Sequence, residues 1–189
     1  MTQVLQPPRL RLTAALAAAA AEKGYAATTI ADIVRHARVS KRTFYEHFTD
    51  KEACLLAGYE QISSRLMDVL RETTVPTDLP WQDQVRVVTA AYLGALEDLP
   101  AVNRALLLEV QAAGAEAYRL RARTQRRFAD LLCELVAASG HTLSPVLSLA
   151  IVGGINELTL HAAESRPFTD LIDPVTDLVV AVISISPSP

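Results

Sequence analysis

Apolar residues recur along most of this chain at intervals of three and four positions, which is the spacing of one face of an α-helix. The segment 51–72 shows the pattern most clearly, with apolar residues at positions 54, 55, 59, 62, 66, 69 and 70. Turn-forming and capping residues divide the pattern into about nine segments. We expect helices at about 10–23, between Thr28 and Ala37, directly after Ser40, and at about 50–72, 82–98, 101–113, 115–138, 145–164 and 171–185.

Side chains that cap helices support these boundaries. A glycine can end a helix in a left-handed conformation, and Ser, Thr or Asp can bond the free N–H groups at a helix start. The sequence 49–52, Thr-Asp-Lys-Glu, has the form of a capping box. The other signals, in chain order, are Gly24, the pair Thr28 and Thr29 with Asp32 near the N3 position, the turn Arg38-Val39, Ser40, and Pro145 after Ser144.

Composition narrows the fold class. Half of the 189 residues are apolar, only 5% are aromatic, and there are seven glycines. An Ala- and Leu-rich chain with little glycine favours helices over sheets. We therefore predict an all-α protein.

Composition also bears on cellular location. Cys54 and Cys133 have no metal-ligand spacing, so we expect neither a disulfide framework nor a structural zinc site. No apolar run reaches about 18 residues, so we expect no membrane span. Arg9 and Arg11 before the apolar run 12–21 imitate a signal peptide, but an Ala-rich amphipathic helix explains them better. The prediction is a cytoplasmic protein with no membrane partner.

Charge is divided unevenly along the chain. The net charge is −3, which alone would argue against nucleic acid. Residues 1–51, however, hold eight Lys or Arg and four Asp or Glu, whereas the remaining residues hold ten and seventeen. All three lysines lie in the first segment. A basic N-terminal part on an acidic body is typical of phosphate binding by that part.

The segment 41–48 is the candidate recognition helix. Phe44 and Phe48 lie one helical turn apart and can anchor it to its own domain. Positions 41, 42, 43, 45 and 47 then remain for DNA, as basic, hydroxyl, phenol and imidazole groups that suit base edges or phosphates. The alternative is an ordinary exposed helix with solvated charges. The caps, the tight turn and the uneven charge together favour a helix-turn-helix over this alternative.

Two segments resemble the DNA-binding domain of the TetR family of bacterial regulators. They are Gly24-Tyr25-x-x-Thr28-Thr29-Ile30-x-x-Ile33 and Val39-Ser40-Lys41-x-Thr43-Phe44-Tyr45-x-His47-Phe48-x-x-Lys51-Glu52. The resemblance implies an all-α homodimer. It also implies a DNA-binding domain at 1–55, with its helix-turn-helix at about 29–48, and an effector-binding and dimerisation domain at 56–189.

The same resemblance implies the DNA contacts. Thr29 and Lys51 would hold phosphates at helix N-termini, and the recognition helix would face the groove and its walls. Many relatives carry Gly or Ala where this chain has Arg42, so their base preference does not transfer directly. The expected DNA-binding residues are Thr29, Ser40, Lys41, Arg42, Thr43, Tyr45, His47 and Lys51.

The last two helices of this family usually form a four-helix bundle between two subunits. Here they are the most apolar stretches of the chain, and two glycines inside a helix suggest a close helix approach. The alternative is an intrachain core. The residues expected at the dimer interface are Ile151, Gly154, Ile155, Leu158, Leu178, Val179 and Val182.

An effector pocket is the third expectation from the resemblance. Aromatic residues at helical spacing are more often core than ligand site, so this set is the least specific. Its members are Tyr59, Met67, Trp81, Tyr92, Leu96, Glu109, Gln111, Tyr118, Phe128 and Cys133.

Catalysis finds little support. The four histidines have no neighbouring nucleophile or paired carboxylate, and no phosphate-loop, dinucleotide or zinc-protease motif is present. We expect no enzyme, cofactor or metal. The prediction is a ligand-responsive regulator, a repressor that binds a palindromic double-stranded operator as a homodimer and releases it with an unknown small-molecule effector. The alternatives are an activator, an effector-independent regulator, or a helical scaffold that has lost DNA binding.

Overall fold

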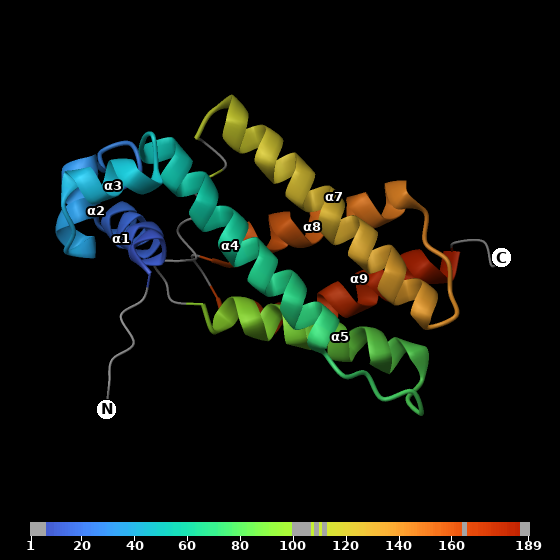
Figure 1. Cartoon of the computed structure of the whole chain (residues 1–189). Helices are drawn as coiled ribbons and strands as arrows, with labels where there is room; N and C mark the ends of the chain where they lie inside the picture. Colours follow the sequence, from blue (N-terminus) through green and yellow to red (C-terminus); the bar gives the residue numbers. More distant parts are fainter. Residues whose placement is uncertain (1–6, 100–106, 108–109, 111–112, 164–165, 186–189) are drawn as a thin grey trace. The chain divides into compact units, whose positions relative to one another are not determined.

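The computed structural model describes residues 7–99, 107, 110, 113–163 and 166–185. These residues form eight α-helices and one 3-10 helix, with no strand among them, which confirms the all-α fold (Figure 1). The helix expected at 101–113 falls mostly outside the described residues. The elements are α1 (Pro8–Lys23), α2 (Ile30–Ala37), α3 (Lys41–His47), α4 (Lys51–Glu72), α5 (Trp81–Glu97), α7 (Ala115–Ala138), α8 (Pro145–Ala162), the 3-10 helix η2 (Phe168–Leu171) and α9 (Ile172–Ile185).

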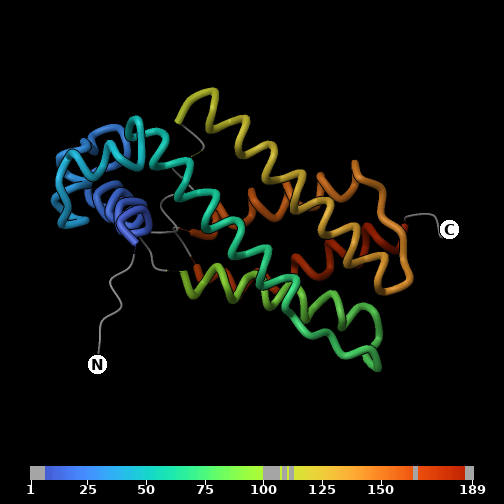
Figure 2. Tube along the Cα trace, viewed as in Figure 1, coloured from blue at the N-terminus to red at the C-terminus, as the bar shows by residue number. Residues whose placement is uncertain are grey.

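The chain divides into two compact units. The first comprises Met1–Ser63 and Pro100–Arg121, and the second comprises Ser64–Leu99 and Ala122–Pro189. Helices α4 and α7 each pass from one unit into the other without interruption, as the tube in Figure 2 shows. The domain boundary expected between residues 55 and 56 stays a prediction, because α4 is continuous there.

In the first unit, α1, α2 and α3 surround a small apolar core. Leu12 and Leu16 of α1, Ile33 of α2 and Phe44 of α3 are all fully buried. Burying an aliphatic or aromatic side chain of this size stabilises a fold by roughly 1.5–3 kcal/mol. A second cluster, formed by Tyr59, Val110, Ala117 and Leu120, lies along α4 and the start of α7.

The helix ends follow the local signals of the sequence. Gly24 ends α1 with a φ of 80°, a conformation that glycine adopts without strain. Thr29 forms a capping box with Asp32 at the start of α2, and Ser40 caps α3 by accepting a 3.0 Å bond from the Thr43 N–H. Arg38, between α2 and α3, has a left-handed backbone with a φ of 52°. No other non-glycine residue in the described part of the chain has a positive φ.

In the second unit, the core is distributed over several helices. Met67, Leu70 and Leu131 are buried together, with Tyr92 and Phe128 packed against them. Polar contacts fix two helix positions within this core. The buried Ser148 hydroxyl of α8 donates a 2.6 Å hydrogen bond to the Ala129 carbonyl of α7. The carboxylate of Glu97, at the end of α5, accepts a 2.6 Å bond from the backbone N–H of Phe168 in η2.

Helix α8 is only partly covered within its own chain, with half of its residues half-buried. Its 18 residues are long and apolar enough to cross a membrane by length and composition alone, which corrects the expectation that no segment meets that test. Only 17% of these residues are buried. The helix itself was expected at 145–164, but Asn, Glu and His interrupt its apolar residues, so no unbroken apolar run of that length stands in the sequence.

The two faces of α3 should differ sharply in their effect on stability. Phe44→Ala should lower the free energy of unfolding by about 3–5 kcal/mol, because it empties a fully buried site. The neighbouring Tyr45→Ala, at a side chain that is 58% exposed, should cost less than about 1 kcal/mol. Urea unfolding of the full chain, followed by circular dichroism, measures both. Equal losses would show that α3 does not pack by its phenylalanine face.

Candidate DNA-binding surface

Helix α3 presents opposite faces to the core and to solvent. Phe44 and Phe48 are buried, and their rings lie 5.8 Å apart. Lys41, Arg42 and Tyr45 are exposed on the other side. The structure therefore separates the anchoring side chains from the candidate DNA contacts as the spacing predicted, and leaves the exposed side free to enter a groove.

The exposed side of α3 is partly held by its own neighbours. The Ser40 and Thr43 hydroxyls lie 3.0 Å apart, and the Thr43 side chain is half-buried, as is that of His47. The Arg42 Nε atom lies 3.2 Å from a Glu46 carboxylate oxygen. Because the Arg42 side chain is 89% exposed, this ion pair contributes little to stability, and Arg42 can exchange Glu46 for a phosphate or a base. All of these side chains stay predicted DNA contacts.

Two arginines at the start of α1 hold the ends of the helix-turn-helix. The Arg11 guanidinium donates to the carbonyls of Ala37 at 2.8 Å and Arg38 at 3.1 Å, at the C-terminus of α2. Arg9 donates to the His47 carbonyl of α3 at 3.3 Å and lies over the Phe48 ring. Cations are favourable at helix C-termini, where carbonyls are unpaired. The sequence gives no local signal for these contacts, because their partners lie 26 to 38 positions further on.

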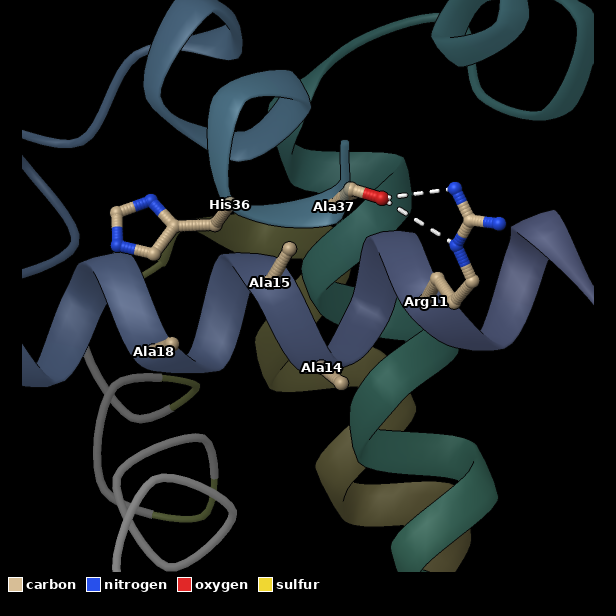
Figure 3. Close-up of a pocket in the computed structure, with 6 residues that line it drawn as sticks. All are labelled: Arg11, Ala14, Ala15, Ala18, His36 and Ala37. Atoms are coloured by element: carbon tan, nitrogen blue, oxygen red, sulfur yellow. Dashed lines mark hydrogen bonds between the residues drawn. The ribbon is translucent and has the colours of Figure 1, made fainter. Parts of the chain in front are cut away.

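Beside Arg11, the surface between α1 and α2 is slightly hollowed (Figure 3). This shallow, open hollow has a volume of about 350 Å³ and is lined by Arg11, Ala14, Ala15, Ala18, His36 and Ala37. The alanines of α1 create it, because their short side chains leave space beside α2. In Figure 3 the Arg11 guanidinium is turned toward the Ala37 carbonyl, so the hollow offers no free cation for a ligand.

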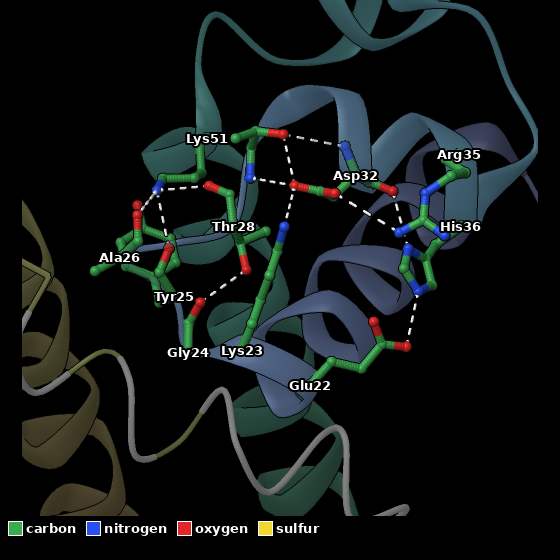
Figure 4. Close-up of polar contacts among 11 residues, drawn as sticks. Glu22, Lys23, Gly24, Tyr25, Ala26, Thr28, Asp32, Arg35, His36 and Lys51 are labelled. Atoms are coloured by element: carbon green, nitrogen blue, oxygen red, sulfur yellow. Dashed lines mark hydrogen bonds and ion pairs between the residues drawn. The ribbon is translucent and has the colours of Figure 1, made fainter.

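At the N-terminus of α2, the donors of Thr29 are bonded to a carboxylate of the same chain. One carboxylate oxygen of Asp32 accepts from the backbone N–H of Thr29 at 2.9 Å, from the Thr29 hydroxyl at 2.6 Å and from the Lys23 ammonium at 2.6 Å (Figure 4). The bonds from Lys23 and Thr29 hold the pKa of Asp32 well below its usual range. Both N–H and O–H donors of Thr29 thus face Asp32. The phosphate contact expected at Thr29 stays a prediction, and it would require a phosphate to displace this carboxylate.

The ammonium group of Lys51 is also bonded within the chain. Its ammonium donates to the carbonyls of Tyr25, Ala26 and Thr28 in the loop between α1 and α2. It also lies 4.3 Å from the centre of the Tyr25 ring. The expected phosphate contact of Lys51 stays a prediction, and these bonds give the residue a competing role inside the domain.

His36 links α2 to α1 through both ring nitrogens. Nδ1 lies 2.9 Å from the Asp32 carbonyl and Nε2 lies 3.1 Å from a Glu22 carboxylate oxygen (Figure 4). Both partners are acceptors, so only the protonated imidazole, with two N–H donors, can bond both. The bond to the Asp32 carbonyl, and then the bond to Glu22, raises the pKa of His36.

The expected effector residues do not gather in one place. Met67, Tyr92 and Phe128 belong to one cluster in the second unit, whereas Tyr59 belongs to the separate cluster of the first. Tyr118 is 69% exposed, and so lines no enclosed cavity. Leu96 is buried, and the Trp81 ring packs against the His141 ring. The Cys133 thiol donates to the Leu143 carbonyl. Glu109 and Gln111 lie outside the described residues. The pocket stays a prediction.

The expected dimer residues divide by exposure. Ile151 and Val179 are buried within their own unit, which leaves them little surface for a partner. Leu178 is exposed. The half-buried members are Gly154, Ile155, Leu158 and Val182. The interface stays a prediction, and its accessible part excludes the two buried residues.

The His36 contact predicts a pH dependence of stability. The unfolded histidine has a pKa near 6.5 and the folded one has a higher pKa, so the folded state holds its proton more tightly. The contact should contribute fully below about pH 6.5 and be lost as the pH rises through the raised pKa. Urea unfolding between pH 5.5 and 8.5 should show a stability difference between the wild type and His36→Gln that shrinks with rising pH. Glu22→Gln should reduce the same dependence, and parallel profiles would contradict it.

Known proteins match part of this chain in sequence and most of it in fold. Residues 12–57 match the family profile for bacterial regulatory proteins of the tetR family. Two uncharacterised helix-turn-helix-type transcriptional regulators of Bacillus subtilis strain 168 are also similar. YxbF is 29% identical over 84 residues and YerO is 43% identical over 51 residues, which are 44% and 27% of this chain. The matches span only 22% and 18% of the lengths of these relatives.

Solved structures extend the likeness over nearly the whole chain. The fatty acid degradation regulator FadR from Bacillus halodurans has a TM-score of 0.73 at 20% identity, over 92% of this chain and 95% of its own. FadR from Bacillus subtilis, in complex with stearoyl-CoA, has a TM-score of 0.68 at 17% identity, over 92% and 98%. TylP, a tetR regulator from Streptomyces fradiae, has a TM-score of 0.66 at 24% identity, over 94% and 85%. Identities this low establish the fold alone, and the profile match adds that residues 12–57 are similar to the DNA-binding region of bacterial regulatory proteins of the tetR family.

Proposed function

We propose that this regulator is a ligand-responsive repressor that binds a palindromic operator as a homodimer in the cytoplasm. The observation that carries the proposal is the exposed side of α3, where Lys41, Arg42 and Tyr45 face solvent while Phe44 fixes the helix from behind. Two such helices, one from each subunit, would enter successive major grooves about 34–36 Å apart.

Most of the basic side chains in residues 1–51 have hydrogen-bond or ion-pair partners inside the first unit. Among the described residues, Arg38 and Lys41 have no hydrogen-bond or ion-pair partner for their side chains. Both lie at or next to the turn that leads into α3. The remaining basic residues of this segment have partners inside the domain, namely Arg9, Arg11, Lys23, Arg35, Arg42 and Lys51. Phosphate binding is therefore expected to centre on the turn and the start of α3, with Arg42 recruited from its exposed pair.

Dimerisation through α8 and α9 accounts for the exposed apolar surface of the second unit. Val146 and Leu149 of α8 and Leu178 of α9 are exposed. Gly153 and Gly154 lie inside α8, where each costs about 1 kcal/mol relative to alanine. An added Cβ at Gly153 would meet no atom within 4 Å in its own chain. The glycines are thus not required by intrachain packing, and the close approach of a second subunit explains them.

The effector is proposed to act on the second unit. The FadR structure from Bacillus subtilis holds stearoyl-CoA in the same fold, so a long-chain acyl thioester is the first ligand class to test. In this chain the apolar cluster of Met67, Tyr92 and Phe128 is the part of the second unit suited to contact an acyl chain. Such a ligand would act only through a different affinity for the DNA-binding and released conformations.

The alternatives differ in what they require. An activator or an effector-independent regulator would keep the operator contacts, whereas a scaffold would lose them. We favour the regulator because unpartnered cations remain at the turn and at the start of α3. The family and the fold are those of transcriptional regulators rather than of enzymes, and we propose that the chain has no catalytic role.

Binding-site selection from random duplex DNA tests the proposal directly. The wild type should enrich a palindrome and bind it with a steep salt dependence. Lys41→Ala should lower the slope of log affinity against log salt by about 0.9 for each phosphate that the variant no longer neutralises. Arg127→Ala, at an exposed arginine of α7, is the matched control and should leave the slope unchanged. Absence of any enriched palindrome would support the scaffold instead.

The proposed dimer interface is tested by comparing a glycine of α8 with a control glycine of α5. Gly153→Leu should shift the protein from dimer to monomer in sedimentation equilibrium, because the new side chain would separate the subunits. Gly94→Leu, in α5, is the control and should leave the dimer intact. An added Cβ at either glycine meets no atom within 4 Å, and circular dichroism of each variant checks that the larger leucine side chain leaves the fold intact. A wild-type protein that stays monomeric at micromolar concentration would refute the interface.

A further inference from the structure

Three backbone carbonyls of the loop between α1 and α2 converge on one side chain. The ammonium of Lys51, the first residue of α4, lies 2.9 Å from the Tyr25 oxygen, 3.3 Å from the Ala26 oxygen and 2.9 Å from the Thr28 oxygen (Figure 4). These residues precede Lys51 by 23 to 26 positions. The contact therefore joins the start of α4 to a distant loop of the same unit.

The hydrogen-bonding capacity of Lys51 is filled by this loop. An ammonium group carries three N–H donors, and three carbonyl oxygens are within bonding distance. The Tyr25 ring, 4.3 Å away, adds a cation–π contact. A DNA phosphate would have to displace one of these partners. Without the ammonium, the part-buried Thr28 carbonyl would lose its Lys51 donor, and the Tyr25 carbonyl would keep only the 3.1 Å bond from the Thr28 N–H, which is unfavourable where water is partly excluded.

The same loop determines where α2 begins. Thr28 is buried, and its hydroxyl donates a 2.8 Å bond to the Gly24 carbonyl. The peptide bond between Thr28 and Thr29 is held at both ends, because its carbonyl accepts from Lys51 and its N–H donates to the Asp32 carboxylate. Thr29 is the N-cap of α2. Lys51 thus fixes the orientation of the peptide that starts the first helix of the helix-turn-helix.

We propose that Lys51 is a positioning residue for DNA binding, which holds the N-terminus of α2 in place and does not contact phosphate. The proposal rests on the proposed function, since it concerns how the DNA-binding surface is held. It assigns the partner of the ammonium to the protein backbone, in place of the phosphate contact that the sequence suggested. The geometry requires three donors that diverge from one nitrogen, which a planar guanidinium cannot supply.

The test compares Lys51→Arg and Lys51→Met with the wild type in the full-length protein. Arginine keeps a charge for phosphate but cannot replace the three converging bonds, whereas methionine keeps the aliphatic stem and removes the charge. Both variants should lose at least tenfold in affinity for a palindrome selected by the wild type, with an unchanged salt slope on random duplex DNA. Lys41→Ala, with its lowered slope, shows that the assay detects the removal of a phosphate-binding side chain.

Hydrogen exchange without DNA provides an independent measurement. In both variants the amides of residues 25–33 should exchange at least tenfold faster than in the wild type, because the start of α2 is released. Unchanged exchange, or full rescue of DNA binding by Lys51→Arg together with a lowered salt slope in Lys51→Met, would overturn the proposal and make Lys51 a phosphate contact. If the wild type selects no palindrome, the proposed function fails, while the exchange rates still decide whether Lys51 holds the loop.

Discussion

The first unit depends on side chains that hold the ends of two very short helices. Helices α2 and α3 have eight and seven residues, so most of their backbone groups lie in terminal turns without an intrahelical partner. Helices of this length are not stable alone. Asp32 and Ser40 bond their N-termini, and Arg11 and Arg9 bond their C-termini. The fixed geometry of the helix-turn-helix follows from these four contacts together with the buried Phe44.

Charge in this unit therefore has two roles that the sequence does not separate. Eight basic residues in the first 51 suggest a strong attraction to phosphate. In the structure, Lys23 bonds a carboxylate and Lys51 bonds three carbonyls, so both charges stabilise the domain itself. Both charges still contribute to the electrostatic potential, but the three donors of Lys51 are all engaged within the domain. The donors that remain accessible are concentrated around the turn and the first residues of α3.

Local features could be predicted from the sequence, and distant pairings could not. The caps at Thr29 and Ser40, the helical end at Gly24 and the buried face of Phe44 and Phe48 all follow from residue type and spacing within a few positions. The bonds of Arg11 and Lys51 join residues about 26 positions apart, and nothing in their local sequence names the partner. The left-handed backbone conformation of Arg38 could not be predicted either, because glycine or asparagine is the usual residue in that conformation. The expected pocket residues share only an aromatic or apolar type, and this does not determine which of them meet.

The limited burial of α8 has a consequence for how the protein behaves at different abundances. A helix with 17% of its residues buried leaves the isolated chain with apolar surface in contact with water. In the proposed dimer, association would remove that surface, so the stability of the folded chain and the fraction paired would both rise with its concentration. If DNA binding requires two subunits, occupancy then rises more steeply than in proportion to the number of chains. On the proposed function, cellular copy number would then act on this protein as a regulatory variable beside any small molecule.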